Sequence, residues 1–306
     1  MKSKSMEIKH IIESQQFDEE TMNLIFKTAN RLSQTAESPL KGKIMASLFY
    51  ESSTRTRFSF EAAMLRLGGN IITSENAKEF SSAAKGETIE DTIRVVSRYA
   101  DIIVLRHPQE GASKRAAAVS SVPIINAGDG IGQHPTQALL DLYTIKKELG
   151  EINGTAIAFA GDLKNGRTVR SLAYLLGKYR DIKIYFISPN QLAIGNDIKE
   201  YLKTRQVKFE ECEKWDDILG KIDVLYQTRI QKERFEIAEE YNRFKGKYIL
   251  SPKEVMRMKN GSIIMHPLPR VDEITTEVDQ MPNAKYFKQA QYGLLVRMAL
   301  LLLLLE

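Results

Sequence analysis

The chain has 306 residues, and its 44 lysines and arginines against 39 aspartates and glutamates give a net charge of +5. That length is enough for two domains, and a composition of 43% hydrophobic and 27% charged residues is typical of a globular protein rather than a disordered or fibrous one. The positive excess is spread along the chain without a basic block, which argues against nucleic acid as a partner. The only cysteine, Cys212, excludes an intramolecular disulfide and a cysteine-built zinc site. Because the first 17 residues also lack the apolar core of a signal peptide, we expect a cytoplasmic protein.

Short apolar runs rich in β-branched residues alternate with helical patterns along the chain. Seven runs predict strands, since each lies close to a glycine, proline or aspartate that would end it. In chain order they are GKIMASLFY, DIIVLRH, SVPIINAGDG, TAIAFAGD, IKIYFIS, DVLYQT and GSIIMHPLP. Strands that alternate with helices form βαβ units, so we expect an α/β fold of two domains, each a mainly parallel sheet flanked by helices.

A long amphipathic helix is predicted between the two domains. The segment HPTQALLDLYTIKKELG, residues 134–150, has Pro135 in its first turn and Gly150 at its end. We therefore expect one domain at residues 1–135 and a second at 136–285, joined by long bridging helices.

The C-terminal segment, about residues 286–306, predicts a helix that packs back on the first domain. Its apolar end, GLLVRMALLLLLLE, is shorter than the span of a membrane and contains Arg297. We therefore expect a buried helix and no membrane partner.

Residues 48–69, LFYESSTRTRFSFEAAMLRLGG, place two arginines and several hydroxyls at the start of a helical pattern. Ser53 is a good N-cap, and Phe58, Ala62 and Leu65 fall on one face of the helix. A helix N-terminus carries about half a positive charge and unpaired N–H groups, so a guanidinium and hydroxyls there form a phosphate cradle. A well-capped helix with exposed arginines explains the same residues. No Walker motif and no G-x-G-x-x-G is present, so the pattern does not indicate a nucleotide.

A series of motifs in chain order resembles the catalytic chain of the aspartate carbamoyltransferases, in the aspartate/ornithine carbamoyltransferase superfamily. The motifs are SSTRTRFSFE, SSAAKGE, VLRHPQEGA, HPTQALLDLYTI, GDLKNGRTVRSL, QTRIQKERF and HPLPRVDEI. The resemblance implies a homotrimer with active sites between domains and between neighbouring chains. It implies transfer of the carbamoyl group of carbamoyl phosphate to the amino group of L-aspartate, which gives N-carbamoyl-L-aspartate and phosphate in de novo pyrimidine biosynthesis. It implies no metal or organic cofactor in this chain.

The resemblance assigns the phosphate of carbamoyl phosphate to the first turn of the helix in SSTRTR. Ser53, Thr54, Arg55 and Thr56 would bind it, in agreement with the helix-terminus argument. Arg106, at the end of the strand DIIVLR, would reach both the phosphate and the carbonyl oxygens.

Four further residues would hold the carbamoyl group. His134 would donate a hydrogen bond to the carbonyl oxygen as a neutral imidazole, without acting as a general base, and Gln137 would bind the amino group. The backbone carbonyl of Leu268, in a turn restricted by Pro269 and cis in the family, would face a substrate nitrogen.

The resemblance assigns the two carboxylates of aspartate to Arg167 and Arg229, with Gln231 assisting, since planar guanidinium groups fit carboxylates. Ser81 and Lys85, in the loop FSSAAKGET, would reach from the neighbouring chain to complete its active site. The catalytic roles would fall to Arg55, Thr56, Arg106, His134 and Lys85.

The remaining histidines are weaker candidates. We expect His10 in solvent, His107 in the turn that follows Arg106, and His266 just before the Leu268-Pro269 backbone. Because no pair has the spacing of helical metal ligands, we expect no metal site.

Two other functions and one partner stay open. An ornithine-type carbamoyltransferase shares the STRTR segment, but it uses a cysteine in an HCLP turn and a Ser-Met-Gly loop, where this chain has Leu268 and QTRIQKERF. A non-catalytic homologue that binds carbamoyl phosphate would have lost a functional position, and none is replaced. RHPQEGASKRA, around Glu110, resembles the segment by which some family members bind a zinc-bearing regulatory chain, so we also expect an allosteric complex.

Overall fold

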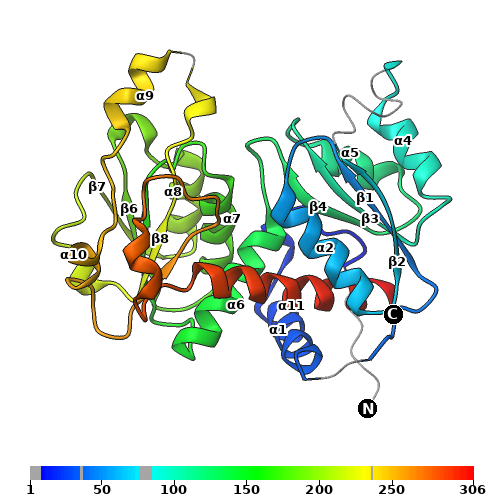
Figure 1. Ribbon diagram of the computed structural model, residues 1–306, viewed down its shortest axis with the longest axis horizontal. Helices are drawn as coiled ribbons and strands as arrows, with labels where there is room; N and C mark the ends of the chain where they lie inside the picture. Colours follow the sequence, from blue (N-terminus) through cyan, green and yellow to red (C-terminus); the bar gives the residue numbers. More distant parts are fainter. Residues whose placement is uncertain (1–7, 35–36, 76–84, 236) are drawn as a thin grey trace. The chain divides into compact units, whose positions relative to one another are not determined.

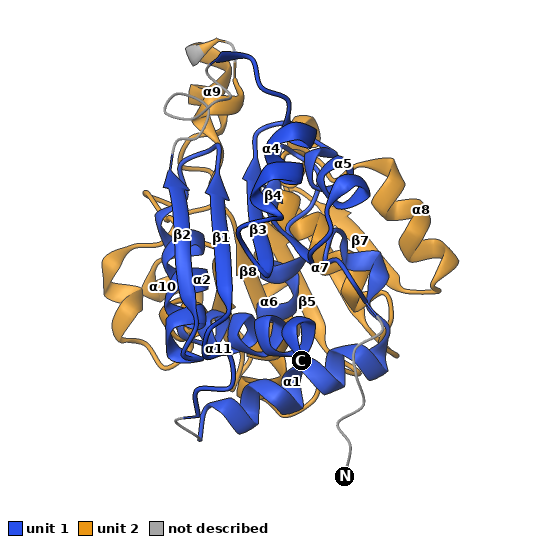
Figure 2. Cartoon of the chain, turned by 90° about the vertical axis from the view of Figure 1, so that its right-hand side faces the viewer, with its two compact units in different colours: residues 1–140, 291–306 blue, residues 141–290 orange. Residues whose placement is uncertain are grey.

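The computed structural model describes residues 8–34, 37–75, 85–235 and 237–306. The chain divides into unit 1, residues 1–140 and 291–306, and unit 2, residues 141–290, drawn in blue and orange in Figure 2. The division falls inside two helices, α6 (Pro135–Leu149) and α11 (Tyr286–Leu305), at residues 140 and 290 rather than at the expected 135 and 285.

Unit 1 contains a four-stranded parallel sheet in the order β2-β1-β3-β4 (Figure 1). Its strands are β1 (Ile44–Phe49), β2 (Asn70–Glu75), β3 (Ile102–His107) and β4 (Ile124–Asp129). Its helical segments are η1 (Ser14–Gln16), α1 (Glu19–Leu32), α2 (Thr54–Arg66), α4 (Ile89–Val96), α5 (Ala112–Val119) and parts of α6 and α11. β1, β3 and β4 are almost entirely buried, as expected of parallel strands covered on both faces.

Unit 2 contains a five-stranded parallel sheet in the order β7-β6-β5-β8-β9. Its strands are β5 (Ala156–Ala160), β6 (Lys183–Ile187), β7 (Lys208–Cys212), β8 (Val224–Gln227) and β9 (Ile263–Met265). Its other helices are α7 (Arg167–Leu176), α8 (Asn196–Thr204), α9 (Ala238–Phe244) and α10 (Pro252–Val255), with short 3-10 segments η3 (Asn190–Leu192), η4 (Leu219–Lys221), η5 (Lys232–Arg234) and η6 (Thr276–Gln280). In both sheets the carboxyl ends of the strands meet at one edge, where such folds bind ligands.

The predicted α/β fold with parallel sheets is confirmed, and each of the seven predicted strands is present. β2 and β7 were not predicted from the sequence. Both lie at the edge of their sheet, and most of their residues are exposed or half-buried. Neither therefore has the continuous apolar run that marks a covered strand.

α11, red in Figure 1, is a 20-residue helix that is long and apolar enough to cross a membrane by length and composition alone. The expectation that this segment is too short to span was therefore wrong. The expectation of burial is met, since Ala299, Leu300 and Leu301 are fully buried. Arg297 is only 4% exposed, and its Nη1 donates to Ser59 Oγ on α2 at 2.9 Å, which fixes the end of α11 within unit 1.

α2 packs against the core with a different face than the one that carries Phe58 and Leu65. Phe60, Ala63 and Met64 are fully buried, whereas Phe58 and Leu65 are 54% and 56% exposed. The predicted stripe through Phe58 and Leu65 is therefore an exposed apolar surface of unit 1 and no part of its core.

Candidate active site

The first turn of α2 provides an anion site at the carboxyl end of β1. Ser53 occupies the N-cap position, but its side chain makes no capping hydrogen bond. The first amides of a helix have no partner within the helix, so these N–H groups point outward from Thr54, Arg55 and Thr56. Thr56 is buried at 8% exposure, and Arg55 is exposed. In a helix that is capped only for stability, the Ser53 hydroxyl would accept a hydrogen bond from one of those amides. Here the Ser53 side chain makes no such bond.

Arg106 lies at the carboxyl end of β3, in register with Phe49 at the end of β1. Its Nη1 donates to the carbonyl oxygen of Ala127 on β4 at 3.3 Å, and its Nε lies 3.2 Å from Glu51 Oε2. The side chain is 13% exposed. These two contacts hold a cationic group at the sheet edge where α2 begins.

His134 precedes α6 and is 3% exposed. Its Nδ1 lies 3.4 Å from Thr136 Oγ1, and its carbonyl oxygen accepts from the amide of Gln137 at 3.0 Å. Asp129, at the end of β4, supports this turn, because its Oδ1 accepts from the amide of Gln133 at 3.1 Å. Unit 1 thus brings the predicted carbamoyl phosphate residues of α2, β3 and α6 to the carboxyl ends of its strands.

In unit 2, Arg167 is the first residue of α7. The preceding turn is held by Asp162, a fully buried residue after β5 whose Oδ1 accepts from the amide of Asn165 at 3.1 Å. Burial raises the pKa of Asp162, while hydrogen bonds from Asn165 and from the backbone of Gln231 oppose the shift. Asp162 therefore connects the turn before Arg167 to the segment that carries Gln231, and the sequence analysis had not singled it out.

Arg229 lies beyond the end of β8, and Glu233 holds its guanidinium. Nη1 donates to Glu233 Oε2 at 3.0 Å, and Nη2 donates to Oε1. This contact raises the pKa of Arg229 and lowers the pKa of Glu233, so both groups are charged at neutral pH. Glu233 contacts the two terminal nitrogens, which leaves the Nε side of the guanidinium for a second carboxylate.

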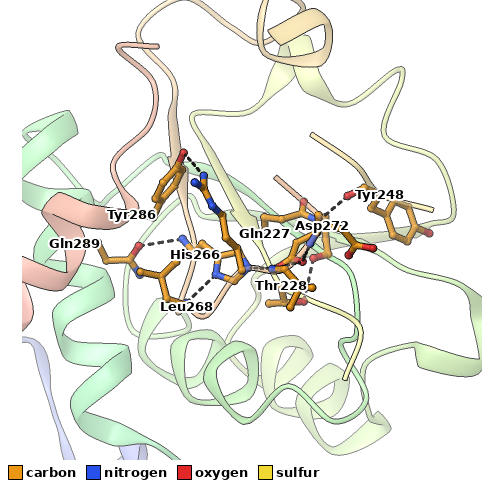
Figure 3. A network of polar contacts seen from close by, with 12 residues as sticks. Gln227, Thr228, Tyr248, His266, Leu268, Asp272, Tyr286 and Gln289 are labelled. Carbon is orange, nitrogen blue, oxygen red and sulfur yellow. Dashed lines mark hydrogen bonds and ion pairs between the residues drawn. The ribbon is translucent and has the colours of Figure 1, made fainter. Parts of the chain in front are cut away.

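The HPLP turn follows β9, and its Leu268-Pro269 peptide bond is cis. Leu268 has φ +54°, a left-handed conformation that leucine rarely adopts. Its amide donates to His266 Nδ1 at 2.7 Å, and His266 Nε2 contacts Glu273 Oε1 at 2.7 Å, within the network drawn in Figure 3. Neither His266 nor Glu273 was predicted from the sequence to have a functional role.

Predictions were also made for Lys85, Ser81 and His10, which do not belong to the residue groups described above. Lys85 is exposed, whereas Ser81 lies outside the described residues. His10 is not in solvent as expected, because its Nδ1 accepts from the amide of Ile124 at 3.1 Å and burial lowers its pKa. Within the described part of the chain, no group of three or more histidine, cysteine, aspartate or glutamate residues could hold a metal ion.

Both halves of the chain match models of one protein family. Residues 9–147 match the carbamoyl-P binding domain of aspartate/ornithine carbamoyltransferase, and residues 153–304 match its Asp/Orn binding domain. The chain belongs to the aspartate/ornithine carbamoyltransferase family.

Several relatives of the chain are named as aspartate carbamoyltransferases. The chain is 56% identical over 301 residues to aspartate carbamoyltransferase 1, chloroplastic, of Pisum sativum, over 96% of this chain and 78% of the relative. It is 55% identical over 304 residues to the aspartate carbamoyltransferase catalytic subunit of Methanocaldococcus jannaschii, over 98% of each chain. Aspartate transcarbamoylase of Trypanosoma cruzi, solved with carbamoyl phosphate and aspartate, matches at a TM-score of 0.92 and 41% identity over 97% of each chain. The family resemblance predicted from the motifs is confirmed.

Proposed function

We propose that the chain is an aspartate carbamoyltransferase, which transfers the carbamoyl group of carbamoyl phosphate to L-aspartate in de novo pyrimidine biosynthesis. The observation that carries the proposal is one anion site in each unit. In unit 1 the open first turn of α2 lies at the same sheet edge as Arg106. In unit 2 the arginines Arg167 and Arg229 follow β5 and β8, neighbours in the sheet. The aspartate-type names of the relatives support the same reaction.

Carbamoyl phosphate is already activated, so the enzyme must orient two anions and stabilise a developing negative charge rather than supply a nucleophile. Ser53, Thr54, Arg55 and Thr56 bind the phosphate through amides, hydroxyls and a guanidinium. Arg106 neutralises charge on the leaving phosphate as the bond breaks.

The carbamoyl group is held by its two polar ends. His134 donates to the carbonyl oxygen and so polarises it, while Gln137 and the Leu268 carbonyl bind the amino group. Arg167 and Arg229 bind the carboxylates of aspartate, assisted by Gln231. No aspartate or glutamate is assigned as a base, so the proton of the attacking amine passes to the departing phosphate.

Ornithine is the rival acceptor. A side-chain carboxylate near Arg229 is attracted, whereas the ammonium of ornithine is repelled, with an interaction of roughly 4 kcal/mol at 4 Å and an effective dielectric of about 20. The test is a colorimetric assay with carbamoyl phosphate and either acceptor. We expect carbamoyl aspartate and no citrulline; citrulline as the main product would overturn the assignment.

We further propose a homotrimer in which Ser81 and Lys85 of one chain complete the active site of its neighbour. The exposed apolar side chains of Phe58 and Leu65 on α2 support an interface on unit 1, as does Ile72 on the edge strand β2, which is 41% exposed. Isolated exposed apolar residues are common, but large ones gathered on adjacent elements mark association surfaces.

A zinc-bearing regulatory chain is proposed as a partner at the segment around Glu110. This segment has a defined shape, since the amide of Gly111 donates to Asp129 Oδ2 at 3.1 Å and a Cβ at Gly132 would lie 3.1 Å from Glu110 Cγ. The Methanocaldococcus relative is named a catalytic subunit, which supports such a complex. Purification of the native complex from the cytoplasm, the proposed location, should yield a second chain with zinc; a bare trimer would count against this partner.

A further inference from the structure

The backbone at Leu268 is held in a conformation that its own residue type does not favour. A leucine at φ +54° brings Cβ close to the following carbonyl oxygen, so the surrounding structure must hold it there. The contact that does so is the hydrogen bond from the Leu268 amide to His266 Nδ1, at 2.7 Å.

That hydrogen bond defines the protonation of the His266 ring. A backbone N–H can only donate, so Nδ1 must carry a lone pair and the ring proton must lie on Nε2. Nε2 lies 2.7 Å from Glu273 Oε1 and donates to it. The imidazole is therefore neutral, and the Glu273 carboxylate fixes both its tautomer and its plane.

Glu273 also holds the rest of the turn. Its Oε2 accepts from the amides of Val271 at 3.1 Å and Asp272 at 3.2 Å. The His266 and Glu273 side chains are 1% and 8% exposed, so water competes little for these contacts. Although burial raises the pKa of Glu273, its hydrogen bonds, foremost that from His266, bring it below the ordinary value.

The His266–Glu273 pair is also held from the side opposite to Leu268, by contacts within unit 2. The amide of His266 donates to Gln289 Oε1 at 3.0 Å (Figure 3). Gln289 Nε2 donates in turn to Asp141 Oδ1 at 2.6 Å. Asp141 also accepts from the hydroxyl of Tyr226 at 2.7 Å. These bonds fix the start of the turn to two helices.

We propose that His266 and Glu273 are positioning residues for carbamoyl transfer, which hold the Leu268 carbonyl against the amino group of carbamoyl phosphate. The proposal rests on the function proposed above for the Leu268 carbonyl. It assigns His266 and Glu273 a role in recognising the amide end of the substrate.

Two variants of similar shape distinguish the role of His266 Nδ1 from the role of His266 Nε2. His266→Asn keeps an acceptor at the position of Nδ1, so it keeps the bond to the Leu268 amide. His266→Gln keeps a polar atom at the position of Nε2 near Glu273 but removes that acceptor. Tyr226→Phe is the matched control, because it cuts the same buried network at the Asp141 end, away from Leu268.

The measurement is the affinity of each variant for inorganic phosphate and for phosphonoacetamide, a stable analogue that carries the amide group, by titration calorimetry. We expect His266→Gln to lose about tenfold or more of the preference for phosphonoacetamide over phosphate, with a fall of kcat of about 10- to 100-fold. His266→Asn should keep most of the preference, and Tyr226→Phe should keep all of it even where its Tm falls.

The outcomes distinguish the two proposals. If wild-type protein shows no preference for phosphonoacetamide over phosphate, the function proposed for the Leu268 carbonyl fails. If wild type shows the preference and His266→Gln keeps it with normal phosphate affinity, the positioning role fails. Should His266→Gln not fold, Glu273→Gln takes its place, since its single side-chain oxygen cannot accept both from His266 Nε2 and from the amides of Val271 and Asp272; an unchanged preference there would equally overturn the role.

Discussion

Arg229 and Glu233 form a two-point ion pair in which both carboxylate oxygens contact the two terminal nitrogens of the guanidinium. Glu233 is 55% exposed, so the pair contributes little to folding. Its effect is geometric, because it fixes the plane of the guanidinium that is proposed to bind aspartate.

Replacement Glu233→Gln should raise the KM for aspartate about fivefold and leave the KM for carbamoyl phosphate nearly unchanged. An exposed pair is worth up to about 1 kcal/mol, which corresponds to roughly that factor. Steady-state kinetics with each substrate varied checks this. The matched control is Asp216→Asn, which breaks the similarly exposed ion pair with Arg257 at 2.8 Å and should change neither KM.

A charge on the exposed face of α2 should dissociate the proposed trimer. Leu65→Asp places a carboxylate on an apolar side chain that is 56% exposed in the isolated chain, so folding should be little affected. Sedimentation analysis should then find monomers of native secondary structure. Met256→Asp, at a residue that is 73% exposed in unit 2, should stay trimeric; a trimeric Leu65→Asp would contradict the proposed interface.

Shared active sites predict complementation between two inactive chains. A mixture of Lys85→Ala and Arg55→Ala chains should recover part of the activity, because some sites then combine an intact Arg55 with an intact Lys85. Activity is measured in mixed trimers separated by differently charged tags. No recovery in verified mixed trimers would rule out a lysine supplied by the neighbouring chain.

The Glu273 carboxylate predicts a pH dependence of stability. Its folded pKa is below the ordinary value of 4.5, so it contributes stability that is present above pH 4.5 and is lost as the pH falls through the folded pKa. The difference in free energy of unfolding between wild type and Glu273→Gln should therefore be constant near pH 7 and shrink below about pH 4. Urea unfolding at several pH values measures it; a difference that grows on acidification would contradict the charged state of Glu273.

The sequence predicted the covered strands because burial on both faces leaves a continuous apolar run. It could not predict β2 and β7, since an edge strand needs no such run. It placed Phe58 and Leu65 on one face of α2 and could not say that this face is exposed. Periodicity identifies an apolar face and does not say whether this chain or another covers it.

Within the site, motifs located the groups proposed to touch substrate, because those groups have fixed chemistry. The residues that position those groups could not be recognised from the sequence. Asp162 and Glu273 look like ordinary acidic residues in the sequence, and only the fold brings them to Asn165 and His266. Both contacts are short-range in the sequence, but they lie in irregular turns after β5 and β9, where hydrogen bonding follows no periodic pattern that a single sequence would show.

The most direct test of the account is calorimetric titration with N-(phosphonacetyl)-L-aspartic acid, which joins a phosphonate to an aspartate. We predict one binding site per chain, weakened at least tenfold by Arg55→Ala and by Arg229→Ala alike, whereas inorganic phosphate should lose affinity only in Arg55→Ala. Unchanged binding in either variant would contradict the roles proposed for Arg55 at the phosphonate and for Arg229 at the aspartate carboxylates.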